Sequence, residues 1–522
     1  MSGKIVGWVV GILALTAGIV CWCALPLIWD GAFQLSVTLL RQHPFVYLTR
    51  FHTLILWQPT VWASHFTDNP WILQAIYGFP FIIAPAVSIA VSWWIVRKQA
   101  PGLIIWAIFG VAAGTLPGQV FIINDSIWQQ TLFWPIFLAV FVDINAKQFF
   151  VLCLLGMFQF VHQIGLPLFV GASAAALILA QFDYENRPRY LRTAIFIGIL
   201  ALAALLKIII TNHIKQFEDT YAEQEFSWWK VREKWQMAVL GYPLAGLICA
   251  WIAAICLFVW STARKELNRR ALGTFAIVLI LAMGGIWIVW AADGHRWYKA
   301  LDYRRWILPL TLPFFTLAFL EACAAARRRA EGGTGFDVVQ LGQTRAAIPL
   351  GSALAEAGPR AENNTSAKAD PTGIVQKRRR LEPRAVCAIL LALIFGSVLS
   401  IQGLVWSRML KQFVRQIDAS PRLVTRLDSI EWIRESPLDH WGSCDAITLL
   451  QGKVPRSIVV TDEQFRGLLK VPALVPNQGW FPQKRRKPPP PGPRGWYDFR
   501  PFMKKLAASG MADLQTQPSA KE

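Results

Sequence analysis

Two aspartates beside apolar segments are the residues of this chain best suited to acid–base chemistry. Asp30 follows the first apolar run, and Asp125 follows the third, in the short turn 124–127. A carboxylate at the edge of a bilayer is costly unless water, a cation or a reacting group compensates its charge. Two such groups can divide the work, because one can accept a proton while the other orients a hydroxyl or holds Mg²⁺ or Mn²⁺. The structural alternatives are that Asp30 caps an interfacial helix and that Asp125 is the N-cap of the next helix.

Basic residues gather in two later segments that the topology derived below places on the same side as these aspartates. Arginine binds phosphate oxygens through paired, charge-assisted hydrogen bonds, so such a group suits a phosphate or pyrophosphate in the headgroup layer. The other interpretation is ordinary contact with anionic lipids. The candidate phosphate-binding or donor-binding residues are Arg296, Lys299, Arg304, Arg305, His213 and Lys215.

The segment between the first two apolar runs, residues 29–71, is rich in aromatic and His residues. Its apolar residues recur at helical spacing, interrupted by Pro44 and Pro59, which predicts two or three short helices in the headgroup layer. They form either a lid over a lipid-facing site or a structural re-entrant segment. We expect a substrate cavity lined by His52 and Trp57 from this segment and by His162 and Gln163 at the end of the fifth apolar run. For the histidines, the alternative is a solvated, capping or backbone-bonded side chain, because no His-x-x-x-His or Cys-x-x-Cys pattern indicates a strong metal site.

Membrane helices are the elements that must position these residues. The chain has 522 residues, of which 54% are hydrophobic, and its mean hydropathy is +0.39. Its apolar runs of about 20 residues have the length of a helix that crosses a bilayer, so we expect an all-α polytopic membrane protein with about eleven transmembrane helices. The predicted spans are 5–28, 72–96, 103–123, 129–143, 148–163, 166–182, 193–211, 237–261, 272–292, 307–325 and 385–406.

Lys and Arg in the short loops predict the orientation. They gather at 97–98, 187–192, 264–270, 327–329 and 377–380. The positive-inside rule makes these loops and the N-terminus cytoplasmic, and an odd number of spans then places the C-terminal tail outside. The short loops suit a bacterial inner membrane with a periplasmic tail. The expected organisation is a transmembrane module 1–325, a flexible cytoplasmic loop 326–384, a last transmembrane helix 385–406 and an extracytoplasmic tail 407–522.

The formal net charge of +20 does not indicate nucleic-acid binding. Much of the excess lies in short loops between spans, a placement typical of topology signals and of contact with anionic membrane lipids. The tail is expected to form a small soluble domain, with an amphipathic helix near 408–436 and a strand at 457–460. Gly110 and Gly114 are four residues apart in the third span, which predicts a close helix–helix contact.

Four of these features together resemble the GT-C superfamily of membrane glycosyltransferases, which includes protein O-mannosyltransferase-like and aminoarabinose-transferase-like enzymes. Asp30 lies just after the first span, and a long first outer loop carries interfacial helices. Asp125 lies in the short second outer loop before an aromatic-Pro entry at 133–135, and the chain ends in an outward tail. The resemblance is one of topology and acid placement over residues 1–310. This chain departs from the paired acidic motif of many relatives, because Gly31 follows Asp30.

The resemblance implies a membrane glycosyltransferase that uses a polyprenyl-phosphate sugar donor. Asp30 would be the general base on an acceptor hydroxyl or amine, and Asp125 would orient that acceptor or help hold a divalent ion. The sugar would leave the lipid phosphate with inversion at the anomeric carbon, and Arg296, Arg304 and Arg305 would stabilise the leaving phosphate. The acceptor, a glycan, lipid or protein, is left open.

Three other functions fit parts of the pattern. A transporter or flippase of a lipid-linked saccharide predicts charged or broken helices near the bilayer midplane, where this sequence offers few charges. A membrane acyltransferase would use His162 as its base. A non-catalytic subunit of an envelope polysaccharide system would tolerate Asp30→Asn, whereas an enzyme would lose turnover.

Overall fold

The computed structural model of the chain is mostly helical. It describes residues 2–27, 30–44, 52–115, 125–158, 165–213, 307–330, 383–420, 422–427, 430, 441–454, 456–460, 494–496, 498 and 500–508. Its elements in the first half are α1 (Gly3–Trp22), η1 (Leu25–Leu27), α2 (Asp30–Arg41), α3 (His52–Leu56), α4 (Gln58–Ala63), α5 (Pro70–Ile82), α6 (Ala84–Val96), η2 (Pro101–Leu103), α7 (Ile104–Thr115), α8 (Asp125–Ala139), α9 (Ala146–Met157), α10 (Gly165–Phe182) and α11 (Arg187–His213). The later elements are α16 (Ile307–Ala330), α17 (Pro383–Ala419), β1 (Val424–Arg426), α18 (Trp441–Leu450), β2 (Ile458–Val460) and α20 (Arg500–Ala508).

Four helical segments are long and apolar enough to cross a membrane. They are Gly3–Trp22, Pro70–Val96, Arg187–Ile209 and Arg384–Ala419, the second being formed by α5 and α6 in succession. Shorter apolar helices lie at Pro101–Gly114, Ala146–Met157, Gly165–Gln181 and Phe314–Cys323. The expected all-helical, membrane-embedded architecture agrees with these helices. The spans expected at 237–261 and 272–292 lie outside the described residues.

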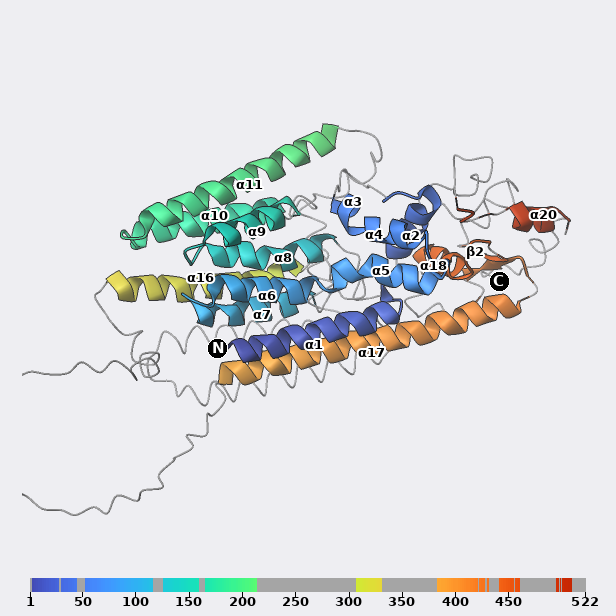
Figure 1. Cartoon of the computed structure of the whole chain (residues 1–522), viewed down its shortest axis with the longest axis horizontal. Coiled ribbons are helices and arrows are strands. Elements are labelled where there is room, and N and C mark those ends of the chain that lie inside the picture. The colour runs from blue at the N-terminus through green and yellow to red at the C-terminus, as the bar shows by residue number, and fades with distance from the viewer. Residues whose placement is uncertain are drawn as a thin grey trace, which may run out of the picture.

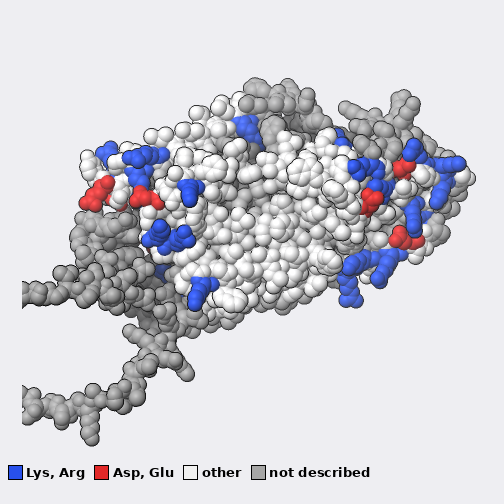
Figure 2. Space-filling view, viewed as in Figure 1, with Lys and Arg blue, Asp and Glu red and all other residues white. Residues whose placement is uncertain are grey.

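The helices form one elongated bundle with two distinct ends (Figure 1). We call the end at which α1 begins the N-terminal end; it contains residues 97–103, 140–146 and 183–192. We call the opposite end, where α2, α3, α4 and the elements after α17 lie, the tail end. Figure 2 shows Lys, Arg, Asp and Glu gathered at both ends of the visible face, with a mostly uncharged band between them. A band of this kind is the surface expected where helices face lipid.

Small residues bring α1 and α17 side by side. A methyl group added at Gly396 would lie 2.6 Å from the Thr16 hydroxyl, and one added at Gly403 would lie 3.1 Å from Cβ of Cys23. Small residues let helices approach closely where no hydrophobic effect drives them together, as in a membrane. The Trp406 indole then donates a hydrogen bond of 2.8 Å to the carbonyl of Ala24.

The first span is shorter than the sequence predicts. We expect a helix over 5–28, but α1 ends at Trp22, Ala24 has φ 57° and a 3₁₀ turn begins at Leu25. Ala24 is held in this left-handed conformation at the point where its carbonyl accepts the Trp406 hydrogen bond. A non-glycine residue with positive φ interrupts a right-handed helix, and this turn redirects the chain into α2.

Three short helices, α2, α3 and α4, form in the first loop, as expected. Pro59 does not interrupt a helix, because it lies in the first turn of α4, where the missing N–H has no intrahelical partner to lose. Asn69 then caps α5 by accepting a hydrogen bond of 2.9 Å from the Trp71 amide, with Pro70 as the first helical residue.

The start of the tail differs from expectation. The expected amphipathic helix near 408–436 is instead the continuation of α17 to Ala419, and β1 follows at Val424. Pro421 supplies a local reason, because proline lacks an amide hydrogen and disfavours helical geometry in the residue before it. The strand expected at 457–460 is confirmed as β2, which pairs with β1 in parallel through Val424 and Ile458.

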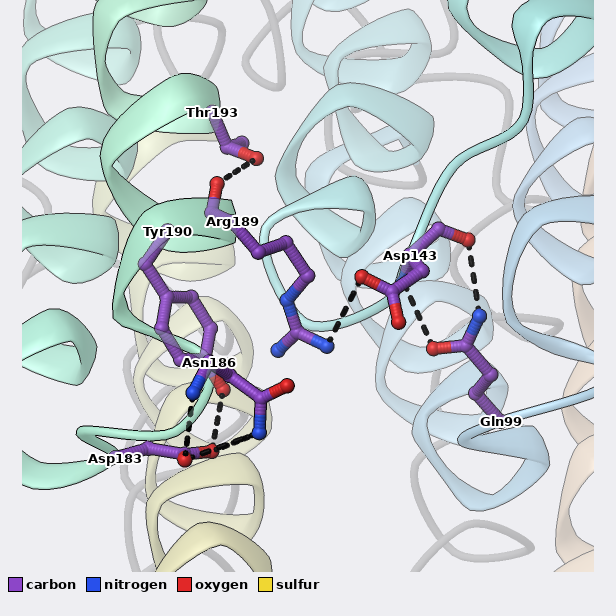
Figure 3. Close-up of polar contacts among 7 residues, drawn as sticks. All are labelled: Gln99, Asp143, Asp183, Asn186, Arg189, Tyr190 and Thr193. Carbon is purple, nitrogen blue, oxygen red and sulfur yellow. Dashed lines mark hydrogen bonds and ion pairs between the residues drawn. The ribbon is translucent and has the colours of Figure 1, made fainter.

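Polar contacts join three connections at the N-terminal end (Figure 3). Gln99 exchanges two hydrogen bonds with the backbone of Asp143, at 2.9 and 2.7 Å. Arg189 reaches Asp143 at 3.5 Å and lies over the Tyr190 ring at 4.3 Å. The Tyr190 hydroxyl donates to buried Asp183 at 3.2 Å. These contacts tie the connections α6–η2, α8–α9 and α10–α11 together.

Glu321 makes a second set of polar contacts at this end, between three helices. Its carboxylate accepts a hydrogen bond of 2.6 Å from the Trp106 indole of α7 and lies 3.3 Å from the Arg384 guanidinium of α17. Glu321 itself belongs to α16, so one acid connects α7, α16 and α17. The bundle is therefore fixed at its N-terminal end by charged contacts.

Candidate functional site at the tail end

Both candidate acids begin helices at the tail end of the bundle. Asp30 is the first residue of α2, and Asp125 is the first residue of α8. The side chains of both lie outside the described residues, and so does the turn before Asp125. The two helix starts come from distant parts of the chain. They can share a site only if side-chain contacts hold α2 and α8 near each other.

Five buried rings lie between the two helix starts, and we call them the aromatic bridge: His52, Trp57, Tyr77, Phe81 and Trp128. Each is at most 6% exposed. They come from α3, from the residue before α4, from α5 and from α8. The bridge contains two of the four residues expected to line the cavity, His52 and Trp57.

One end of the bridge belongs to the Asp125 helix. The Trp128 ring stacks on His52, with centroids 5.5 Å apart and an interplanar angle of 26°, and lies 5.7 Å from Phe81. The Trp128 indole donates a hydrogen bond of 3.2 Å to the carbonyl of Pro80. Trp128 is three residues after Asp125, and residues at that spacing lie on one face of a helix. The first turn of α8 is therefore fixed against α3 and α5.

The other end of the bridge reaches the Asp30 helix. The Trp57 ring lies 4.9 Å from Tyr77 and 6.3 Å from Phe81. The Tyr77 hydroxyl donates to Oε1 of Gln34 at 3.3 Å. Gln34 is four residues after Asp30, one helical turn away on the same face. A continuous path of contacts thus runs from Gln34, one turn after Asp30 in α2, to the first turn of α8.

Polar side chains continue from Asp125 into the interior of α8. Gln129, Gln130 and Thr131 are consecutive and each is at most 3% exposed. Neither the amide nitrogen nor the amide oxygen of Gln130 has a hydrogen-bond partner among the described residues. A buried amide without partners is unfavourable, and in native proteins such a group calls for an explanation such as a bound water or ligand.

Helical periodicity places Gln130 at the interface with α16. Gln130 shares one face of α8 with Phe133, Trp134 and Phe137, at spacings of three, four and seven residues. Those three rings all pack against Phe315 of α16, at 5.6, 4.1 and 4.8 Å. Gln130 lies one turn nearer the tail end than Phe133 and Trp134, on the side of α16 where that helix begins at Ile307.

The predicted cationic residues adjoin this end in sequence but are not themselves described. Arg296, Lys299, Arg304, Arg305 and Lys215 lie outside the described residues, and His213 is the last residue of α11 with an undescribed side chain. Arg304 and Arg305 directly precede α16, whose first residue is Ile307. The structure therefore shows only where the segment that carries Arg304 and Arg305 joins α16. That these arginines lie near the two acids stays a prediction.

His162 and Gln163 also lie outside the described residues, between α9 and α10. The residue after α9, Phe158, contacts Trp128 edge-on at 5.9 Å. The connection that carries His162 and Gln163 therefore leaves α9 beside the aromatic bridge, and the expected cavity role of both residues stays a prediction.

The arrangement provides apolar rings around a few polar groups. Trp57 contributes a buried indole nitrogen that has no hydrogen-bond partner among the described residues. Rings with sparse, oriented polar groups also line small-molecule sites, and here the rings pack directly on one another. In the part of the chain that the structure describes, no three His, Cys, Asp or Glu side chains lie together in a metal-binding group. A metal ion would depend on Asp30 and Asp125, whose side chains are not described.

Five residues of the site were not expected from the sequence: Gln34, Tyr77, Phe81, Trp128 and Gln130. Gln34 and Tyr77 are 43 residues apart, so their contact carries no local signal. The three polar residues 129–131 at the start of an otherwise apolar helix are a visible signal, because buried polar side chains in membrane helices are rare.

Comparison with known proteins gives no relative from which a role can be transferred. No family model, no curated protein and no solved structure matches the chain.

Proposed function

We propose that the chain is a membrane glycosyltransferase that moves a sugar from a polyprenyl-phosphate carrier to an acceptor outside the bacterial inner membrane, at the tail end. The observation that carries the proposal is the aromatic bridge, because it connects the helical turns that begin with Asp30 and Asp125. A carboxylate pair at one membrane face can divide the work of this chemistry, because one acid accepts the proton while the other orients the acceptor. The GT-C resemblance supports the same assignment.

In the proposed step, Asp30 accepts the proton of the acceptor hydroxyl or amine. The acceptor atom bonds to the anomeric carbon from one side while the bond from that carbon to the phosphate oxygen breaks on the other, so the configuration inverts. The electron pair leaves with the polyprenyl phosphate, and fixed cations lower the barrier by stabilising the charge that develops there. Arg296, Arg304 and Arg305 are assigned that role, with Lys299, His213 and Lys215 as further donor contacts.

Asp125 is assigned to orienting the acceptor or to helping hold a divalent cation. The polyprenyl chain would lie between helices, which explains why the site belongs at the edge of the apolar band. The placement of charge favours an enzyme over a transporter, because the charges on the visible face lie at the two ends of the bundle (Figure 2). A transporter site is expected near the midplane.

The test is transfer of a labelled sugar from polyprenyl phosphate in reconstituted vesicles. Asp30→Asn and Asp125→Asn are expected to lower the transfer rate by about 100-fold or more, as for loss of a general base or of a substrate-orienting carboxylate. Asp418→Asn is the matched control, because it makes the same change at an exposed carboxylate of the tail end. Transfer that survives Asp30→Asn at the wild-type rate contradicts the proposed mechanism and favours a non-catalytic subunit.

A further inference from the structure

The part of α17 beyond the apolar band carries a basic face. Arg408, Lys411 and Arg415 follow one another at three and four residues, so they lie on one side of the helix, and all three are exposed. The opposite side is fully buried at Leu410 and Phe413. The Lys411 ammonium lies 5.4 Å from the Trp71 ring, which fixes this turn of α17 at the level of the start of α5.

The basic face continues onto the rest of the tail. Exposed cations stand at Arg422, Arg456, Lys504 and Lys505, and Figure 2 shows Lys and Arg prevailing at this end of the visible face. We call Arg415, Arg422, Arg456, Lys504 and Lys505 the tail cations. None of them makes an ion pair with a side chain that the structure describes.

Two of the acids that the structure describes at this end are already paired. Asp68 is paired with Lys453 at 2.6 Å, and Asp498 is paired with Arg500 at 2.7 Å. The hydrogen bond from Arg500 holds the pKa of the Asp498 carboxyl below its ordinary value, so this acid stays charged and committed to its partner. Asp418 is exposed and makes no ion pair with a described side chain, but among the described residues of this end the cations outnumber the acids, so the tail cations can bind an anion from outside the chain.

The height of the tail cations above the membrane indicates whether they contact lipid phosphates or a soluble ligand. Arg408 is the first charged residue of α17 after its apolar run, which marks the level of the headgroups. With a rise of 1.5 Å per residue, Arg415 lies about 10 Å and the end of α17 about 16 Å beyond Arg408. The headgroup layer adds only about 5–8 Å to each side of the hydrocarbon core. Arg415 and Arg422 therefore lie past the lipid phosphates.

The tail is docked onto the candidate site. α18 packs against α2, the helix that begins with Asp30. Lys453 pairs with Asp68, and Arg494 contacts His65, both in the segment between α4 and α5. A ligand bound by the tail cations is consequently held beside the first loop and α2.

We propose that the tail cations bind an acidic glycan chain and that this chain is the acceptor of the sugar. This inference rests on the proposed function and adds the chemical class of the acceptor to it. A tail of this length is carried across a membrane largely regardless of its charge, so its basic surface does not follow from topology and is explained by a partner of opposite charge. Repeated negative charge along the acceptor would match the cations spread from α17 to α20 and bring its end towards Asp30.

The binding test uses dextran sulfate as the probe and neutral dextran as its control. The full chain is held in phosphatidylcholine nanodiscs, in which both ends of the bundle are accessible to the probe. The quadruple variant Arg415→Gln, Arg422→Gln, Arg456→Gln, Lys505→Gln is expected to raise the dissociation constant for dextran sulfate at least 10-fold. The dependence of affinity on salt concentration should also become shallower, because fewer counterions are exchanged on binding.

The matched control is Arg97→Gln, Lys98→Gln, Arg187→Gln, Arg192→Gln. It removes the same number of exposed Arg and Lys residues from the N-terminal end, and it should leave the dissociation constant within twofold. Equal thermal unfolding of the two variants verifies that neither effect is a loss of fold. Wild-type affinity in the tail variant overturns the inference.

Two further outcomes are decisive. If the tail variant keeps wild-type affinity for dextran sulfate but loses co-purifying phosphatidylglycerol, the surface binds lipid and the inference is wrong. If the wild-type chain transfers sugar equally well with and without saturating dextran sulfate, the proposed function stands while the acidic acceptor is refuted. Absence of any transfer, with dextran sulfate still bound, refutes the enzyme instead and leaves the anion-binding surface in place.

Discussion

At the residue scale, Asp30 and Asp125 each begin a helix, and the five rings of the aromatic bridge connect the parts of α2 and α8 that follow them. Asp30 and Asp125 are recognisable because each charge borders an apolar run, and the structure places each at the start of a helix. His52 and Trp57 are expected to line a cavity, and both belong to the aromatic bridge. Tyr77 gives no such signal, because its polar contact with Gln34 depends on the tertiary fold. The bridge could therefore be found only from the structure.

Gln130 provides a prediction at this scale. A buried amide without partners destabilises the fold by about 1–3 kcal/mol relative to an apolar group of the same shape. Gln130→Met should therefore raise the apparent melting temperature in detergent, in the absence of substrate. If Gln130→Met has a higher melting temperature without substrate and also binds the sugar donor more weakly, then the Gln130 amide contacts the ligand.

The control for this prediction is Gln74→Met, another fully buried glutamine. Its amide donates hydrogen bonds of 2.6 Å to the Cys21 carbonyl and 2.9 Å to the Trp71 carbonyl. Removing it should lower the melting temperature, because two carbonyl groups lose a donor. A lower melting temperature in Gln130→Met, equal to that in Gln74→Met, would mean that Gln130 is satisfied within the fold.

At the element scale, apolar length and proline placement predict most of the helices but not their ends. α10 and α16 begin within a residue of the expected spans. The sequence does not predict the end of α1, because Ala24 adopts a left-handed conformation where its carbonyl accepts a hydrogen bond from Trp406, a residue 382 positions away. The extent of α17 is missed because its apolar and amphipathic parts form one continuous helix, and nothing in their composition marks a break between them.

The packing of α7 against α8 gives the second prediction. Gly110 faces Trp134, and a methyl group at this position would overlap the indole ring. Gly110→Ala should therefore destabilise the protein by about 1–3 kcal/mol through overpacking. Gly171→Ala in α10 is the control, since no atom lies within 4 Å of the added methyl group.

Thermal unfolding of both alanine variants measures the difference. Alanine is favoured over glycine in a helix by up to about 1 kcal/mol, so Gly171→Ala should be neutral or stabilising. Equal melting temperatures for the two variants would show that α7 and α8 are not in contact at Gly110.

At the scale of the whole molecule, the two ends differ in how they are held together. Charged and polar contacts of Asp143 and Arg189 (Figure 3), together with those of Glu321, fix the N-terminal end. Aromatic packing and the docked tail form the other end. The sequence predicts that the two ends differ, since it separates the basic loops from the outward segments. The spans expected between residues 214 and 306 lie outside the described residues. The proposed enzyme requires both carboxylates at the tail end.

The distance between positions 30 and 125 tests this requirement most directly. Spin labels on Asp30→Cys and Asp125→Cys, in a chain whose native cysteines are replaced, give that distance by double electron–electron resonance. It should be shorter than the ~30 Å thickness of the hydrocarbon core, whereas Asp30→Cys paired with Asp143→Cys at the N-terminal end should exceed it. A distance between positions 30 and 125 as long as that of the 30–143 pair would place the two acids on opposite sides of the membrane and contradict the proposed site.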